Sequence, residues 1–273
     1  MNFNFYMPSR VIFGKGSLNN LHKQKLPGKK ALIVTGGTSI KKFSYLKRLE
    51  EQLDKANISH VLFDKILPNP IKEHVMEASN IVKKEKCDFI IGIGGGSSID
   101  SSKSIAIMST NDGDYWDYIF GGTGKGKAIP NDPLPVVAIT TTAGTGTEAD
   151  PWTVITNGKE KIGFGYDKTY PFLSIVDPKL MKTVPSKLTA YQGFDALFHS
   201  TEGYINKIAN EMSENEYCTE CWNCISCGEN EHCKYCGECG RDICSDCIYI
   251  FFPSSVQLPT FTGLTRLLIS KTS

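Results

Sequence analysis

Neither sign of charge is in excess in this sequence, and long apolar runs are missing. The 30 Lys and Arg residues nearly balance the 29 Asp and Glu residues, so the net charge is +1 at pH 7. Without a broad basic field, nothing draws the chain to nucleic acid or anionic lipid. No apolar run approaches the roughly 20 residues that a bilayer-spanning helix needs. The start MNFNFYMPSRVIFG also lacks the regions of a secretory signal. We therefore expect a soluble, cytoplasmic protein without nucleic-acid or membrane partners.

Cysteine is nearly absent from residues 1–217, where Cys87 stands alone, and is then abundant. Nine cysteines lie between residues 218 and 247, spaced C-x2-C-x2-C-x2-C-x5-C-x2-C-x2-C-x4-C-x2-C. In a reducing compartment such clusters indicate metal rather than disulfides. Repeated Cys-x-x-Cys pairs let two thiolates reach one ion. We predict structural Zn²⁺ held by Cys218, Cys221, Cys224, Cys227, Cys233, Cys236, Cys239, Cys244 and Cys247.

Two other interpretations of the cysteine-rich segment stay open. An iron–sulfur site begins well with Cys218, Cys221 and Cys224, but the longer gap and the Cys-Pro ending of a bacterial ferredoxin are missing. Alternatively, the residues after about 213 are foreign to the fold, through a frame error, a mispredicted gene or a recombination event.

Apolar strand-like runs alternate with helix-like stretches from Lys30 to about Ile175. The runs are ALIV (31–34), HVLF (60–63), DFIIGIG (88–94) and LPVVAIT (134–140). Between them, leucines recur at helical spacing from Leu46 to Leu53, and Val75, Ala78 and Val82 form a second helical face. This alternation predicts a parallel sheet with crossover helices, covered on both faces because its strands are continuously apolar. From Ser186 the strand pattern ceases and a helical segment begins.

Glycine and threonine follow two of these strands. GGGSSIDSSK (94–103) comes directly after an apolar strand, and its glycines let the backbone approach a ligand closely. The helix that follows offers free N–H groups and a positive dipole end, which suit a pyrophosphate. TTAGTGTE (141–148) follows the next strand. Two such loops at the carboxyl ends of parallel strands open onto the same crevice, where open sheets bind ligands.

Together these motifs resemble the iron-containing alcohol dehydrogenase family. PSRVIFGKG, PNP, GIGGGSSIDSSK, GDYWDY, TTAGTGTEAD, VDPKL and GFDALFHSTEGY occur in the family's order and spacing over about residues 3–212. The resemblance implies an α/β fold with a parallel-sheet dinucleotide-binding domain at 1–185. An all-helical metal-binding domain begins at 186–216 and is truncated, followed by the cysteine-rich segment at 217–247 and an unassigned tail at 248–273.

The resemblance also assigns cofactor contacts to single positions. Those of the pyrophosphate loop are Gly95, Gly96, Ser97 and Asp100. Those that hold phosphates and the nicotinamide side are Thr141, Thr142 and Thr145. A cleft-lining asparagine and a cofactor-contacting lysine match Asn69 and Lys161.

The loop after the first of these strands bears on the choice between NADP and NAD. Many NAD-using members have an Asp here that binds the ribose hydroxyls, whereas this chain has TGGTSIKK (35–42). Gly36 and Gly37 supply no carboxylate, while Ser39 offers a hydroxyl and Lys41 or Lys42 a positive charge. An acid would repel a 2′-phosphate and this loop would not. We therefore favour NADP over NAD.

The candidate metal ligands are Asp195 and His199. Their spacing of four residues places them on one face of a helix, and a carboxylate with an imidazole suits Fe²⁺ or Zn²⁺. The resemblance identifies them as the first two of four ligands, of which two are downstream histidines. Only His232 among the five histidines lies downstream, inside the cysteine-rich segment.

The predicted function is hydride transfer between NADP (or NAD) and a small alcohol or aldehyde, with the metal polarising the substrate oxygen. Because two metal ligands are missing, a truncated and inactive nucleotide-binding relative is an alternative. A zinc-binding interaction protein on a dehydrogenase scaffold is another. Because members of the family often form dimers or larger assemblies, a homo-oligomer is compatible with the sequence.

Overall fold

The computed structural model describes residues 6–205, 233–235 and 242–244. The chain divides into two compact units, Met1–Val184 and Pro185–Ser273. In the first unit, a six-stranded sheet has the strand order β1-β8-β5-β4-β2-β3. All its strand pairs are parallel. Its strands are β1 (Arg10–Phe13), β2 (Lys30–Gly36), β3 (Ser59–Ile66), β4 (Phe89–Gly94), β5 (Val136–Thr140) and β8 (Leu173–Val176). This architecture confirms the predicted α/β class.

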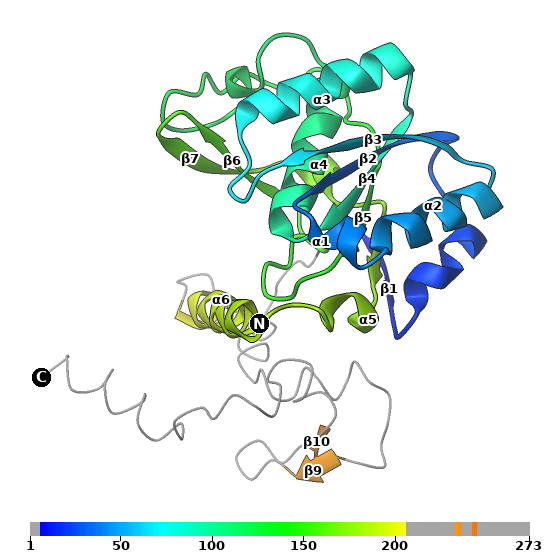
Figure 1. The fold of residues 1–273 in the computed structure, drawn as a ribbon. Coiled ribbons are helices and arrows are strands. Elements are labelled where there is room, and N and C mark those ends of the chain that lie inside the picture. Colours follow the sequence, from blue (N-terminus) through cyan, green and yellow to red (C-terminus); the bar gives the residue numbers. More distant parts are fainter. Residues whose placement is uncertain (1–5, 206–232, 236–241, 245–273) are drawn as a thin grey trace, which may run out of the picture. The chain divides into compact units, whose positions relative to one another are not determined.

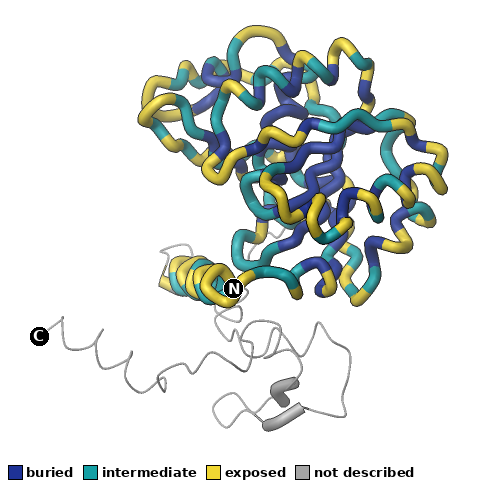
Figure 2. The backbone as a smooth tube through the Cα atoms, viewed as in Figure 1, coloured by how far each residue is buried: buried dark blue, intermediate teal, exposed yellow. Residues whose placement is uncertain are grey.

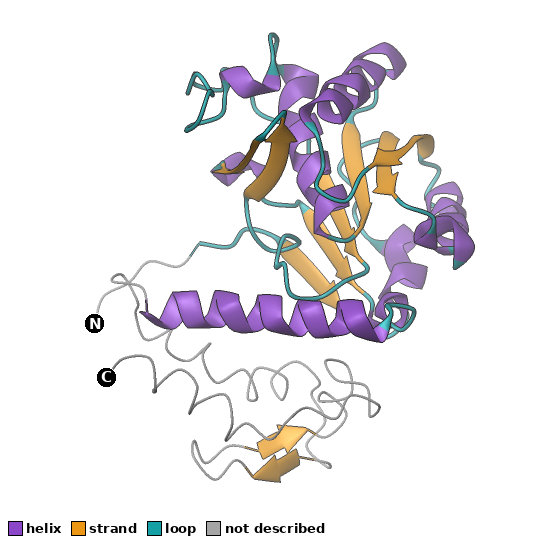
Figure 3. Cartoon of the chain, turned by 60° about the vertical axis from the view of Figure 1, so that its left-hand side comes forward, coloured by secondary structure: helices purple, strands orange, loops and turns teal. Residues whose placement is uncertain are grey.

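Helices cover both faces of the sheet (Figures 1 and 3). They are α1 (Ser39–Lys42), α2 (Tyr45–Lys55), α3 (Lys72–Glu85), α4 (Gly96–Thr110) and α5 (Pro178–Met181). Short 3-10 turns, η1 (Ser17–Lys23), η2 (Tyr115–Asp117) and η3 (Asp167–Thr169), complete the helical elements. The central strands lie buried between these helices (Figure 2).

The residues of β2 are continuously apolar because both faces of the strand are buried. Leu32 and Val34 face the core that α3 and α4 close. Ala31 and Ile33 face the opposite core, which η1 and α2 close. Because successive side chains of a strand point to opposite faces, both sets are needed, and all four residues are fully buried.

A separate antiparallel hairpin lies beside this sheet. It consists of β6 (Trp152–Asn157) and β7 (Glu160–Gly165), and β6 packs against α4. The sequence pattern did not predict this hairpin, nor the short strands β1 and β8. Each of those two strands has only four residues, too few for a periodic pattern to stand out.

The second unit contains α6 (Ser186–Ile205), β9 (Cys233–Tyr235) and β10 (Asp242–Cys244). Strands β9 and β10 pair antiparallel, with Cys233 opposite Cys244. The rest of the predicted segments 186–216, 217–247 and 248–273 lies outside the described residues. No helix in the described part of the chain is long and apolar enough to cross a membrane.

Candidate active site: two loops at the carboxyl edge of the sheet

Strand β4 ends in a turn that leads the chain directly into helix α4. Gly94 has φ +150°, and a Cβ there would lie 2.5 Å from Ser98 Oγ, so only glycine fits without strain. Gly95 is the N-cap of α4, and no side chain caps the helix. The first N–H groups of α4 and the positive end of its dipole are thus available to an anion.

The threonine-rich loop after β5 packs directly on this turn. Strands β4 and β5 are neighbours, with Gly94 paired to Thr140, and Thr141 N donates to Gly94 O over 2.9 Å. A Cβ on Gly95 would lie 3.1 Å from Thr142 Oγ1, and one on Gly96 would lie 3.1 Å from Thr145 Cγ2. The two loops predicted to share a crevice therefore touch.

Two buried hydroxyls near these strand ends have no hydrogen-bond partner among the described residues. They are Thr145 Oγ1, in the loop after β5, and Thr35 Oγ1, near the end of β2. Buried polar atoms are nearly always satisfied, so the Thr145 hydroxyl, beside an uncapped helix, is available to a bound group. Thr145, Gly95 and Gly96 fit the diphosphate of a dinucleotide: a hydroxyl donor, free backbone donors and no Cβ in the way.

The carboxylate of Asp100 is turned into the protein. Its Oδ1 accepts from Thr147 Oγ1 over 2.6 Å and its Oδ2 accepts from Val154 N over 3.0 Å. Burial raises the pKa of Asp100 to about 6, although the Thr147 hydroxyl and the Lys103 ammonium oppose the rise. The predicted phosphate contact of Asp100 stays a prediction, and the observed bonds fasten α4 to the hairpin.

Lys103 lies about one turn after Asp100 on α4 and is fully buried. Its ammonium lies within 2.9 Å of Thr147 Oγ1, Asp150 O, Asp150 Oδ1 and Trp152 O. Burial lowers the pKa of Lys103, and the Asp150 carboxylate partly offsets this effect. Lysine is rarely buried unless paired, so this side chain has a structural task that its place in the sequence motif did not reveal.

Two further predicted residues meet although 92 positions separate them. Lys161 Nζ on β7 donates to Asn69 Oδ1 over 2.8 Å. Asn69 has φ +57°, a left-handed conformation that asparagine tolerates better than most residues. The Pro-Asn-Pro turn and the hairpin thus bring an amide and an ammonium to one place.

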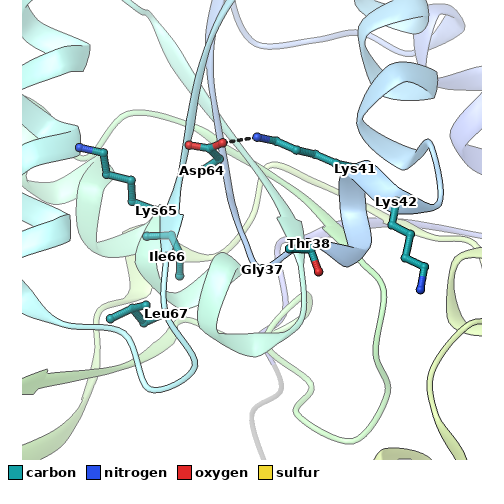
Figure 4. A pocket seen from close by; sticks show the side chains of 8 residues that line it. All are labelled: Gly37, Thr38, Lys41, Lys42, Asp64, Lys65, Ile66 and Leu67. Atoms are coloured by element: carbon teal, nitrogen blue, oxygen red, sulfur yellow. Dashed lines mark hydrogen bonds and ion pairs between the residues drawn. The ribbon is translucent and has the colours of Figure 1, made fainter.

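A pocket of about 630 Å³ lies at the ends of β2 and β3 (Figure 4). Its lining is Gly37, Thr38, Lys41, Lys42, Asp64, Lys65, Ile66 and Leu67. Of the predicted Gly36, Gly37 and Ser39, only Gly37 is in this lining. Gly36 packs tightly at the end of β2, where a Cβ would lie 2.0 Å from Ile66 O. The sequence did not identify Asp64, Lys65 or Thr38 as members of this site.

The charges of the pocket are partly paired. Lys41 forms an ion pair with Asp64, visible as the dashed line in Figure 4, and this bond lowers the pKa of Asp64. Lys65 pairs with Glu77 over 2.5 Å. For Lys42, no carboxylate partner is found within the described ranges. The pocket therefore combines the Asp64 carboxylate with the Lys42 ammonium, whose Nζ lies 5.5 Å from the centroid of the Phe43 ring.

Helix α6 carries the predicted metal pair. Asp195 Oδ1 and His199 Nε2 lie 3.7 Å apart on the same helix face. The donors suit Fe²⁺ or Zn²⁺, but two side chains are fewer than the three or more protein ligands of a catalytic metal site. Within the described residues no group of three or more His, Cys, Asp or Glu side chains could hold a metal ion. The pair alone does not complete a metal site.

Most of the predicted zinc ligands, Cys218, Cys221, Cys224, Cys227, Cys236, Cys239 and Cys247, lie outside the described residues. Cys233 and Cys244 are described only through the backbone pairing of β9 and β10. The zinc prediction therefore stays a prediction.

Comparison with known proteins identifies the family. The model of the family described as "Iron-containing alcohol dehydrogenase" matches residues 8–178, which is more than half of the chain. The chain belongs to the iron-containing alcohol dehydrogenase family.

Curated relatives and solved structures agree with this placement. A "Probable NADH-dependent butanol dehydrogenase 1" of Bacillus subtilis is 36% identical over 220 residues, covering 80% of this chain and 56% of the relative. A 1,3-propanediol dehydrogenase of Citrobacter freundii is 38% identical, covering 78% of this chain and 55% of the relative. The crystal structure of NADH-dependent butanol dehydrogenase A of Thermotoga maritima superposes with a TM-score of 0.74 at 34% identity, covering 79% of this chain and 54% of that one.

These matches fix the family's dinucleotide-binding fold for the described sheet and its helices. The chain spans about half the length of the curated relatives it matches. The part of the family that this chain most directly shares is therefore the dinucleotide-binding fold. The reactions of the relatives are only proposed for this chain.

Proposed function

We propose that this chain binds the diphosphate of a nicotinamide dinucleotide between the turn after β4 and the loop after β5. The observation that carries the proposal is the contact of these two loops, with an uncapped helix and the unpartnered Thr145 hydroxyl at the same edge. The amide and ammonium of Asn69 and Lys161 would face the ligand from the hairpin side.

The preferred coenzyme is NADP, with NAD as the alternative. The pocket at the ends of β2 and β3 has three lysines and one carboxylate. Lys42, which lacks a carboxylate partner within the described ranges, would pair with the 2′-phosphate. Asp64 opposes this preference because its charge repels a phosphate and its oxygens can accept from ribose hydroxyls. Relatives named as an NADH-dependent butanol dehydrogenase and an NAD-dependent methanol dehydrogenase also favour NAD.

The reaction proposed is hydride transfer between the coenzyme and a small alcohol or aldehyde. Asp195 and His199 would supply two ligands to Fe²⁺ or Zn²⁺, and the bound metal would polarise the substrate oxygen. The described set of metal ligands is incomplete. Nucleotide binding is therefore the part of the proposal that the loops after β4 and β5 support independently of the metal.

Titration of the purified full chain with NADPH and with NADH, followed by coenzyme fluorescence, tests binding. We expect NADPH to bind with a dissociation constant about tenfold lower, equivalent to one additional charge-assisted contact. Gly96→Val should abolish binding because its side chain would displace Thr145. Gly163→Ala is the matched control, since a Cβ there meets only Val154 Cγ2 at 3.9 Å.

The outcomes separate the alternatives. If neither coenzyme binds, the nucleotide site is wrong; if NADH binds more tightly, only the coenzyme preference is wrong. NADP-linked oxidation of short alcohols with added Fe²⁺ or Zn²⁺ then tests the reaction. Binding without turnover would favour an inactive relative over a dehydrogenase.

A further inference from the structure

A buried chain of polar groups links helix α4 to the segment that follows the threonine-rich loop. Lys103 Nζ donates to Thr147 Oγ1 over 2.9 Å, and Thr147 Oγ1 donates to Asp100 Oδ1 over 2.6 Å. The Thr147 hydroxyl thus accepts from an ammonium and donates to a carboxylate. Lys103 is fully buried, Thr147 is 3% exposed and Asp100 is half-buried.

The same two helical residues hold the chain beyond Thr147. The second carboxylate oxygen of Asp100 accepts from Val154 N over 3.0 Å. Lys103 reaches the carbonyl oxygens of Asp150 and Trp152 over 2.8 and 2.9 Å. Residues 147–154 are therefore fastened to α4 at several points, and all of these bonds use Asp100 or Lys103.

This arrangement leaves Asp100 poorly suited to touch an anion. Both of its oxygens already accept hydrogen bonds from the protein. A carboxylate facing a diphosphate would also repel it. Thr145, by contrast, lies two residues before the fastened Thr147, with its methyl group against Gly96 and its hydroxyl buried and unpartnered among the described residues.

On the basis of the nucleotide binding proposed above, we propose that Thr147 is the positioning residue of the site: together with Asp100 and Lys103 it fixes the loop 141–145 against α4, so that Thr145 is held where the diphosphate binds. Asp100 and Lys103 act through Thr147 and do not contact the nucleotide. Neither periodicity nor the family motif assigned a role to Thr147.

The test compares Thr147→Val, which keeps the shape and removes the hydroxyl, with Thr147→Ser, which keeps the hydroxyl. We expect Thr147→Val to raise the dissociation constant for NADPH about tenfold, as expected for the loss of one hydrogen bond to charged groups. Thr147→Ser should restore affinity to within about twofold of the original chain. A role confined to global stability would lower the free energy of unfolding of Thr147→Val in urea but leave the NADPH dissociation constant of the folded chain within about twofold of the original.

A double-mutant cycle with Asp100→Asn separates positioning from direct contact. If Asp100 acts through Thr147, the double variant binds NADPH no more weakly than the weaker of the two single variants. Additive losses would mean that Asp100 acts independently of Thr147, and tighter binding by Asp100→Asn alone would mean that Asp100 faces the phosphates directly; either result would overturn the proposal.

Hydrogen exchange without nucleotide keeps this test independent of the proposed function. Amides in 141–150 should exchange about tenfold faster in Thr147→Val than in Thr147→Ser, because the bonds that hold the loop are lost. Equal exchange in the two variants would overturn the proposal even if NADPH binds. Failure of the original chain to bind any coenzyme, with unequal exchange in the variants, would remove the proposed function and leave Thr147 as a residue that orders this loop.

Discussion

Replacement of Gly94 by alanine gives the most direct test of how the turn between β4 and α4 is built. The backbone at Gly94 has φ +150°, a conformation that side chains rarely adopt. An added Cβ would also lie 2.5 Å from Ser98 Oγ and 2.9 Å from Ser98 Cβ. Ser98 is on the first turn of α4, so relief of the contact requires the helix to move.

The expected cost follows from these two effects. A residue held in a sparsely populated conformation costs about 1–3 kcal/mol, and overpacking of a tightly packed site costs about 1–3 kcal/mol. Gly94→Ala should therefore lower the free energy of unfolding by about 2–6 kcal/mol. This is a large part of the roughly 5–15 kcal/mol that stabilises an ordinary domain.

Urea unfolding followed by circular dichroism measures this loss. Gly158→Ala is the matched control, because Gly158 has φ +59° and no atom within 4 Å of an added Cβ. The control should lose only about 1–2 kcal/mol, the cost of the left-handed conformation. If Gly94→Ala loses no more than Gly158→Ala, the close approach of Ser98 does not exist and the reasoning is refuted.

Three further predictions concern buried or paired carboxylates. Asp64→Asn should lower the dissociation constant for NADPH severalfold in a fluorescence titration, since it removes an anion from the pocket and frees Lys41 from its ion pair; an equal change for NADH would contradict this. Because burial raises the pKa of Asp100 from 3.8 to about 6, the folded state binds a proton more tightly than the unfolded state. Its stabilising contribution is thus complete below about pH 4 and is lost as the pH rises through about 6, by up to about 1.4 kcal/mol per pH unit. Urea unfolding between pH 4 and 7 should show this slope reduced in Asp100→Asn, and identical slopes would contradict it. Asp177→Ala should lower the free energy of unfolding by about 2–4 kcal/mol in the same assay. The reason is that the buried carboxylate accepts from Gly16 N and Lys179 N and lies 3.6 Å from Arg48 Nη2; a loss under 1 kcal/mol would mean that these contacts do not stabilise the fold.

The sheet and the place of the two loops could be predicted from the sequence because each signal is local. The runs at 31–34, 60–63, 88–94 and 134–140 all lie wholly or largely in observed strands. Val75, Ala78 and Val82 are buried on one face of α3, as their spacing predicted. Glycines and threonines placed directly after strands identified the carboxyl edge without any knowledge of strand order.

The pocket was only partly predictable because its composition depends on which strands are neighbours. Strand β3 lies at the edge beside β2, and this puts Asp64 opposite Lys41, 23 positions earlier in the chain. Asp64 and Lys65 directly follow the apolar run HVLF (60–63) as two adjacent charged residues, so nothing local marks the carboxylate as part of a site. The sequence has no acid directly after β2, yet this did not exclude an acid from the next strand.

The buried lysine shows a second limit. Lys103 ends a motif whose glycines and serines already explained a phosphate loop, and lysine is ordinarily exposed. Its partners lie 44 to 49 positions away: Thr147 and Asp150 precede the hairpin that periodicity did not detect, and Trp152 is its first residue. A residue type that usually faces solvent therefore became part of the core only because the fold brings three oxygen-bearing residues to its ammonium.

The residues that fasten the loop after β5 and the residues that line the pocket at the ends of β2 and β3 act on nucleotide binding in separable ways. Thr147 and its partners hold a loop that would face the diphosphate, a group common to NAD and NADP, so their loss should weaken both coenzymes by the same factor. Lys42 and Asp64 line the other pocket, where only the 2′-phosphate distinguishes the coenzymes, so their replacement should change the ratio of the two affinities. A substitution at Thr147 that altered this ratio would mean that the loop and the pocket are one coupled structure, and the assignment of separate tasks to α4 and to the ends of β2 and β3 would fail.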